Sequence, residues 1–82
     1  MSSYLLETYT PAATLLEELE ARVQSAAAEL SESGTPVRYV RSIFVPEDET
    51  CFHLLDGGSR EAVAQTAERA GISTPRITKA AP

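Results

Sequence analysis

Hydrophobic residues recur along the chain with two different periods, which predict short strands and two helices. In residues 4–9, YLLETY, strict alternation predicts a strand. Its two faces carry Tyr4, Leu6 and Thr8 on one side and Leu5, Glu7 and Tyr9 on the other. Because a carboxylate is costly beneath packed helices, the Glu7 side is predicted to be the face of the sheet that helices leave open.

After this strand, apolar residues recur every three or four positions, which predicts a helix. Thr10 and Pro11 are expected to start the helix, since Thr is a good N-cap and Pro is tolerated at the first helical position. A single apolar stripe then runs through Leu15, Leu16, Leu19, Val23, Ala26, Ala27 and Leu30. Gly34 and Pro36 predict the end of the helix, because Gly supplies a left-handed residue and Pro disfavours a helical conformation before it.

The second half of the chain reads as a hairpin, a helix and a last strand. Residues 37–45 and 50–55 are predicted strands joined by the short turn PEDE, which makes the pair antiparallel. Ser59 is expected to cap a helix over residues 60–70 that ends at Gly71, and residues 75–80 form the last predicted strand. The order βαββαβ predicts a single α+β domain over residues 1–82, with a ferredoxin-like fold and a four-stranded antiparallel sheet.

Composition narrows the class of protein. The chain has 82 residues, 12 acidic and 7 basic side chains, and a net charge of −5. Nucleic acid and anionic membranes are not expected as partners, because their binding requires clustered Lys and Arg. A single Cys cannot form an internal disulfide and suits a reducing cytoplasm, so we predict a cytoplasmic protein. No apolar run approaches the roughly 20 residues that span a bilayer, and we expect no signal peptide.

The open face of the sheet carries the candidate chemistry. Phe52 and Leu54 are predicted to lie beneath the helices, which sends Cys51, His53 and Leu55 to the open face. An apolar sheet face invites association. We therefore predict a homodimer in which two open faces stack and enclose a cavity, as in a dimeric α+β barrel.

Two registers are open for residues 37–45. A regular hairpin places Val40, Ser42 and Phe44 on the same face as His53. A bulge near the turn instead places Tyr39, Arg41 and Ile43 there, and this register is preferred because Arg41 would otherwise lie beneath a helix.

The candidate site then consists of six residues. His53 could act as a catalytic acid or base, because the ordinary pKa of histidine lies near neutrality. The predicted ligand-binding residues are Glu7, Tyr9, Tyr39 and Arg41, with Arg41 holding a carboxylate. Cys51 and His53, two residues apart on one strand, could also bind Ni²⁺ or another divalent transition metal. The structural alternative is that His53 is a hydrogen-bonded interface residue and Cys51 a small buried apolar residue.

The stretches RYVRSIFVPEDETCFHLLDG, SREAVAQTAERAGI and PRIT, together with YLLETY, resemble a small bacterial family of unknown function, some of whose members bind nickel. The resemblance covers nearly the whole chain and implies a ferredoxin-like fold and the dimeric α+β-barrel association. The nickel-binding members carry further His residues near the first strand and helix, where this chain has Tyr9 and Thr10. Nickel here would thus depend on His53 and Cys51 of both subunits meeting at the dimer axis.

Three functions follow from these patterns. The first is a dimeric protein that binds a small ligand or a metal such as nickel on its open sheet face. The second is a cofactor-independent enzyme of the dimeric α+β-barrel type, a monooxygenase, isomerase or cyclase, with His53 as the base and Arg41 and Tyr39 as substrate-binding residues. The third is a structural module whose open face is filled by side chains.

Overall fold

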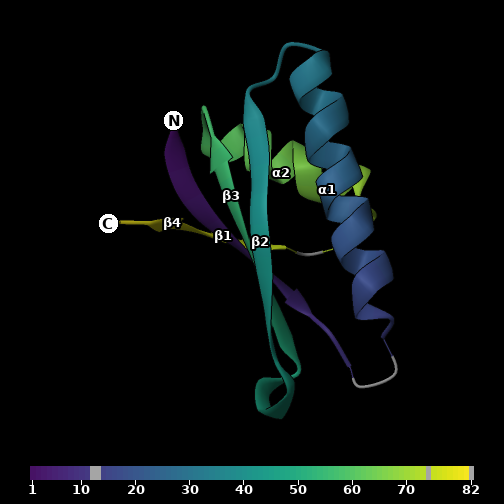
Figure 1. Ribbon diagram of the computed structural model, residues 1–82. Helices are drawn as coiled ribbons and strands as arrows, with labels where there is room; N and C mark the ends of the chain where they lie inside the picture. Colours follow the sequence, from purple (N-terminus) through teal and green to yellow (C-terminus); the bar gives the residue numbers. More distant parts are fainter. Residues whose placement is uncertain (12–13, 74, 82) are drawn as a thin grey trace.

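The computed structural model describes residues 1–11, 14–73 and 75–81. Its four strands pair into one sheet against which the helices pack. The elements follow in the order β1 (Ser2–Tyr9), α1 (Leu16–Glu32), β2 (Val37–Val45), a 3-10 turn (Pro46–Asp48), β3 (Thr50–Gly57), α2 (Arg60–Arg69) and β4 (Arg76–Ala80). The strands form one antiparallel sheet in the order β2-β3-β1-β4. Both helices lie on the same side of this sheet (Figure 1). This confirms the predicted α+β, ferredoxin-like arrangement.

The core lies between the helices and the covered face of the sheet. Leu6 of β1 and Leu55 of β3 are fully buried against Val23 of α1 and Val63 of α2. Small residues of both helices, among them Ala26 and Ala67, also belong to this core. Alanines let the helices approach the sheet closely, while the branched residues supply most of the apolar area removed from water.

The first helix starts later than the sequence predicts. Thr10 does not cap it: the Thr10 amide donates to the Glu49 carbonyl (2.6 Å), and its hydroxyl donates to the Thr8 carbonyl (3.1 Å). The helix begins at Leu16 without a side-chain cap, and residues 12–13 of the predicted first turn lie outside the described residues. Thr10 therefore ties the end of β1 to the β2–β3 turn, and this tertiary contact overrides its capping propensity.

Both helices end as predicted, in Schellman motifs. After α2, the Ile72 amide donates to the Ala67 carbonyl (2.9 Å) and the Gly71 amide to the Glu68 carbonyl (3.1 Å), with Gly71 at φ +79°. The predicted cap at the start of α2 is also present, because the Ala62 amide donates to the Ser59 hydroxyl (3.2 Å). Neither of the two helices found in the described part of the chain combines the length and the apolar character needed to cross a bilayer.

Two glycines offer a matched test of the turn geometry. We expect Gly71→Ala to lower the free energy of unfolding by about 1–2 kcal/mol, because an L-residue with a Cβ is strained in the left-handed region. Gly58→Ala should cost less, since Gly58 has no positive φ and an added Cβ would meet Pro36 at an ordinary 3.7 Å. Urea denaturation of both variants measures the difference. Equal destabilisation would contradict the assignment of strain to Gly71.

Candidate functional site

His53 lies beneath the helices, so the prediction that it faces the open side of the sheet is wrong. In the β1–β3 register Leu6 pairs with His53 and Thr8 with Cys51. His53, Cys51 and Leu55 are each 0% exposed. Phe52 and Leu54 are the residues on the open face, where both are half-buried.

Cross-strand pairing explains the reversal. Residues paired across two strands share a face, so the outward position of Glu7 also turns its partner Phe52 outward. Gly57 lies on the same side of β3 as His53, and a Cβ there would meet Val63 of α2 at 3.3 Å. This side of β3 therefore faces the helices. The hydropathy of Phe52 and Leu54 had suggested the opposite assignment, and the glycine at the end of the strand is the sequence signal that could have corrected it.

His53 is accommodated in the core by a chain of hydroxyl groups. Its Nδ1 lies 2.6 Å from the Ser42 hydroxyl, which lies 2.7 Å from the Tyr39 hydroxyl. Its Nε2 lies 3.2 Å from the Thr8 hydroxyl, which in turn lies 3.2 Å from the Thr10 hydroxyl. Both ring nitrogens therefore have partners, as a buried polar group requires.

The hydrogen bonds determine the tautomer of His53. The Thr10 hydroxyl donates its proton to the Thr8 carbonyl, and the single proton of the Thr8 hydroxyl is donated either to the Cys51 carbonyl (3.4 Å) or to the Thr10 hydroxyl. Thr8 is then left to accept from His53 Nε2–H. Nδ1 accordingly accepts from Ser42, and Ser42 accepts from Tyr39. This arrangement satisfies every member of the network, which we call the His53 network, with a neutral imidazole.

Burial keeps this imidazole neutral. Desolvation lowers the pKa of His53 from 6.5 to about 4, because the charged ring would lose its hydration. Desolvation likewise raises the pKa of the Cys51 thiol, with a smaller effect in the same direction from the charge of Glu20. His53 is thus a weak base, and Cys51 carries no reactive thiolate at neutral pH. His53 is therefore not suited to the acid–base role predicted from the sequence.

A bulge in β2 brings Tyr39 to the covered side as well. The pairing with β3 shifts between Tyr39 and Arg41, which leaves Val40 as the extra residue. Ser42 and Phe44 share a face with His53, whereas Arg41 and Ile43 face the open side. The predicted bulge near the turn is therefore wrong, because the strands pair regularly there and Ser42 and Phe44 lie with His53, as in the other register. The bulge at Val40 lies further along the strand, and it separates Tyr39 from Arg41. Arg41 avoids the helices, as predicted, without joining His53.

Of the six predicted site residues, three remain on the open face: Glu7, Tyr9 and Arg41. Two cross-strand rows form its centre. They are Arg41, Leu54, Leu5 and Thr78, then Ile43, Phe52, Glu7 and Arg76. Glu7 lies 3.5 Å from the Arg76 guanidinium, and Tyr9 at the end of β1 is 75% exposed. Ile43 lies on the open face, as the preferred register predicted. The sequence did not indicate Arg76 as a member of this face, because that requires the register of β4.

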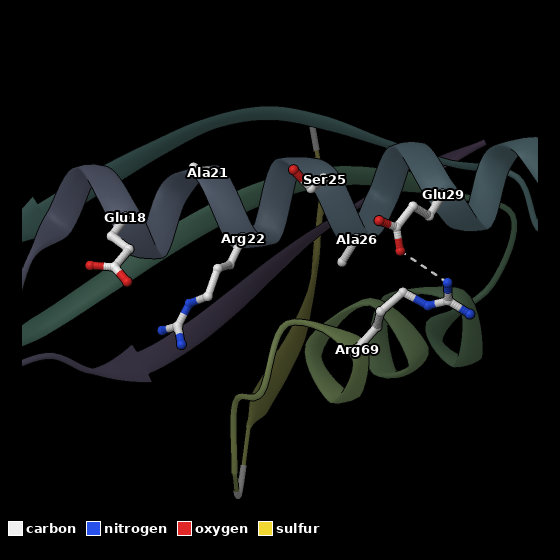
Figure 2. Close-up of a pocket in the computed structure, with 7 residues that line it drawn as sticks. All are labelled: Glu18, Ala21, Arg22, Ser25, Ala26, Glu29 and Arg69. Atoms are coloured by element: carbon white, nitrogen blue, oxygen red, sulfur yellow. Dashed lines mark hydrogen bonds and ion pairs between the residues drawn. The ribbon is translucent and has the colours of Figure 1, made fainter.

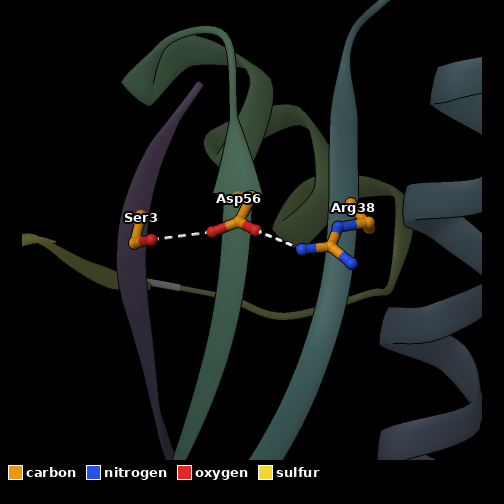
Figure 3. A network of polar contacts seen from close by, with 3 residues as sticks. All are labelled: Ser3, Arg38 and Asp56. Carbon is orange, nitrogen blue, oxygen red and sulfur yellow. Dashed lines mark hydrogen bonds and ion pairs between the residues drawn. The ribbon is translucent and has the colours of Figure 1, made fainter.

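A polar cluster closes one end of the open face. The Ser3 hydroxyl donates to one oxygen of the Asp56 carboxylate (2.7 Å), and the Arg38 guanidinium donates to the other (2.7 Å), as Figure 3 shows. The hydrogen bond from Ser3, followed by that from Arg38, lowers the pKa of Asp56. Beside this cluster, a hollow of about 650 Å³ is lined by residues from both ends of the chain and by Leu54.

A second groove, of about 300 Å³, runs between α1 and α2 on the helix side of the molecule (Figure 2). Its charged side chains alternate in sign, and Arg69 of α2 forms an ion pair with Glu29 of α1 at 3.1 Å. Both members of this pair are exposed. Since opposite charges balance along the groove and no buried polar group faces it, it does not compete with the open face as a candidate site.

Comparison with known proteins identifies the family. The family model described as "Nickel responsive protein SCO4226-like" matches residues 4–79. The chain belongs to this family. The resemblance seen in the sequence is thereby confirmed. The crystal structure of SCO4226 from Streptomyces coelicolor A3(2) matches with a TM-score of 0.74 and 20% identity, covering 99% of this chain and 98% of that one, which establishes the shared fold. No curated protein matches the chain significantly.

The described residues do not fit a nickel site. Nickel is held by several nitrogen, oxygen or sulfur ligands, and residues 1–11, 14–73 and 75–81 contain no group of three His, Cys, Asp or Glu side chains arranged to hold a metal. Both nitrogens of His53 are engaged by hydroxyls, and the Cys51 sulfur lies 4.0 Å from its Nδ1. Because both residues lie beneath the helices, a dimer formed through the open faces cannot bring two such pairs together.

The His53 network makes stability depend on pH. Between pH 6.5 and about 4 the unfolded chain binds a proton on His53 that the folded chain does not, so the free energy of unfolding falls as the pH is lowered. The full loss across this window is about 3 kcal/mol. About 2 kcal/mol of this loss occurs between pH 7 and pH 4.5, and urea denaturation at these two pH values measures it. His53→Gln is the variant that should lack this loss. The low pKa of Asp56 acts in the same direction, but only as the pH falls below its ordinary value of 3.8.

Direct titration of the wild-type ring gives a control that does not depend on the variant folding. His53 is the only histidine, so its ring resonances in a ¹⁵N NMR spectrum are unambiguous. We expect the Nε2–H tautomer and no protonation above about pH 5. An ordinary pKa near 6.5 would show that His53 is not enclosed as described.

Nickel uptake should not depend on His53. We expect native mass spectrometry with added Ni²⁺ to give the same metal content for the wild type and for His53→Gln, because the His53 ring is committed to Ser42 and Thr8. Zn²⁺ serves as the control metal. Stoichiometric nickel that disappears in His53→Gln would show that the ring leaves the core to bind metal, and would contradict the fit described here.

Proposed function

We propose that the chain is a small-ligand-binding homodimer, in which the open faces of two sheets stack and enclose the ligand. The observation that supports this proposal is the apolar character of a face that the helices do not cover. Tyr9 is 75% and Ile43 is 47% exposed there. Leu5, Phe52 and Leu54 lie beside them, only half-buried within one chain. An exposed apolar patch of this kind, surrounded by polar groups, is typical of an association surface.

A second copy of the chain is a suitable occupant because the face carries charges of both signs. Its carboxylates, Glu7 and Asp56, lie on the two central strands, whereas Arg38, Arg41 and Arg76 lie on the outer strands β2 and β4. In a two-fold dimer the same surface must complement itself. Because Asp56 and Glu7 are each paired with an arginine of the same face, most of the charge is balanced within one chain, and a second copy can cover the face without repulsion between like charges.

The enzyme alternative loses its geometric basis. It requires a base beside a pocket that a substrate can enter. His53 is fully buried, its pKa lies near 4, and none of the hollows found along the described residues is lined by it. A non-catalytic binding role on the open face needs neither His53 nor Cys51. A metal such as nickel would need ligands from the open face of both copies instead.

A charged substitution on the open face tests the dimer. We expect Ile43→Asp to weaken dimerisation by about 100-fold, because it removes apolar burial and places a carboxylate in the interface. The matched control is Leu15→Asp, at a position 69% exposed just before α1, on the other side of the molecule. Analytical ultracentrifugation and native mass spectrometry measure the equilibrium. A monomeric wild type, or equal effects of both variants, would contradict the proposal.

A further inference from the structure

We infer that the ligand held between the two open faces is a small organic carboxylate, and that Arg41 binds its charged end. This inference rests on the proposed dimer and adds the chemistry of its ligand. It starts from a difference among the three arginines of the open face. Arg38 is paired with Asp56 at 2.7 Å and Arg76 with Glu7 at 3.5 Å. Arg41 takes part in none of the ion pairs or side-chain hydrogen bonds found among the described residues.

The charge of the open face differs in sign from that of the chain. The strand residues of this face include three guanidinium groups and two carboxylates, whereas the whole chain has a net charge of −5. The excess cation is Arg41. Most of the acidic side chains lie on the helices and the β2–β3 turn, so the open face is the part of the surface suited to an anion.

Dimerisation makes an anion necessary at Arg41. A second copy that covers the face removes water from the guanidinium, and a buried unpaired charge is strongly unfavourable. The two carboxylates of each open face already have arginine partners. An anion from outside the protein is therefore the group that can neutralise Arg41 without breaking an existing pair.

The neighbours of Arg41 suggest the shape of that anion. Arg41 is paired with Leu54 across β2 and β3, and Leu5 continues the same row on β1. Phe52 lies next to this row. A planar guanidinium binds a carboxylate through two parallel hydrogen bonds. The apolar row beside it fits the hydrocarbon or aromatic body of the same molecule, which inorganic phosphate does not have.

Benzoate is the probe, benzamide is its neutral analogue, and inorganic phosphate is the anion without an apolar body. We expect isothermal calorimetry to show benzoate binding to the wild-type dimer and binding weakened at least about tenfold in Arg41→Gln, as expected for loss of a charge-assisted contact. Benzamide lacks the charge that Arg41 binds. Its affinity for the wild type should therefore be no higher than the affinity of benzoate for Arg41→Gln. The matched control is Arg22→Gln, which removes the same charge from an exposed position on α1.

The oligomeric state separates this inference from the proposal on which it rests. Benzoate should tighten the wild-type dimer, because a ligand that binds only the dimer stabilises it. Arg41→Gln should dimerise at least as tightly as the wild type without any anion. A dimer that does not bind benzoate, or binds it equally well in Arg41→Gln, overturns the inference and leaves the dimer standing. Phosphate binding equal to that of benzoate overturns the carboxylate assignment, and a monomeric protein overturns both proposals.

Discussion

A buried imidazole holds three strands of the sheet in one register. His53 on β3 needs a partner for each ring nitrogen, and these come from Ser42 on β2 and Thr8 on β1. A slip of either neighbouring strand by one residue would turn its hydroxyl to the other face and leave a buried nitrogen unpaired, at a cost of about 1–3 kcal/mol. The same slip would turn apolar residues such as Leu6 away from the core. The His53 network therefore adds to the register that the apolar core already specifies.

The bulge in β2 belongs to the same constraint. Residues 39 and 42 of a regular strand point to opposite faces, because side chains alternate with a period of two. The extra residue Val40 places Tyr39 on the same side as Ser42, and the Tyr39 hydroxyl can then donate to Ser42. The same shift places Arg38 on the open face, whereas Arg41 faces outward by its alternation with Ser42. One local irregularity thus completes the buried network and sets the charge of the open face.

The sequence predicts the elements well because their signals are local. Ser59 before α2 and Gly71 after it act through atoms a few residues away, and both were predicted correctly. Thr10 also looks like a cap, but a contact with Glu49, distant in sequence, decides its role. The face of β3 is likewise a non-local property. Hydropathy assigns Phe52 to the core and His53 to the surface. The pairing of Phe52 with the outward-facing Glu7 and the hydroxyls that bind His53 make the opposite arrangement favourable.

The candidate site follows from the same division between local and non-local information. Glu7 and Arg41 could be placed from the cost of burying a charge, which is a property of each residue alone. His53 could not, because its burial depends on hydroxyls that the neighbouring strands supply, and Cys51 lies on the same side of β3 as His53. Tyr39 could not, because its side of β2 depends on the bulge at Val40. His53 and Cys51, the residues most suited to a soft metal or to catalysis, are buried in the core. The chemistry left for a ligand is that of the open face, where arginine side chains border an apolar surface. The proposed ligand site thus depends on open-face residues, which the fold shared with SCO4226 does not constrain.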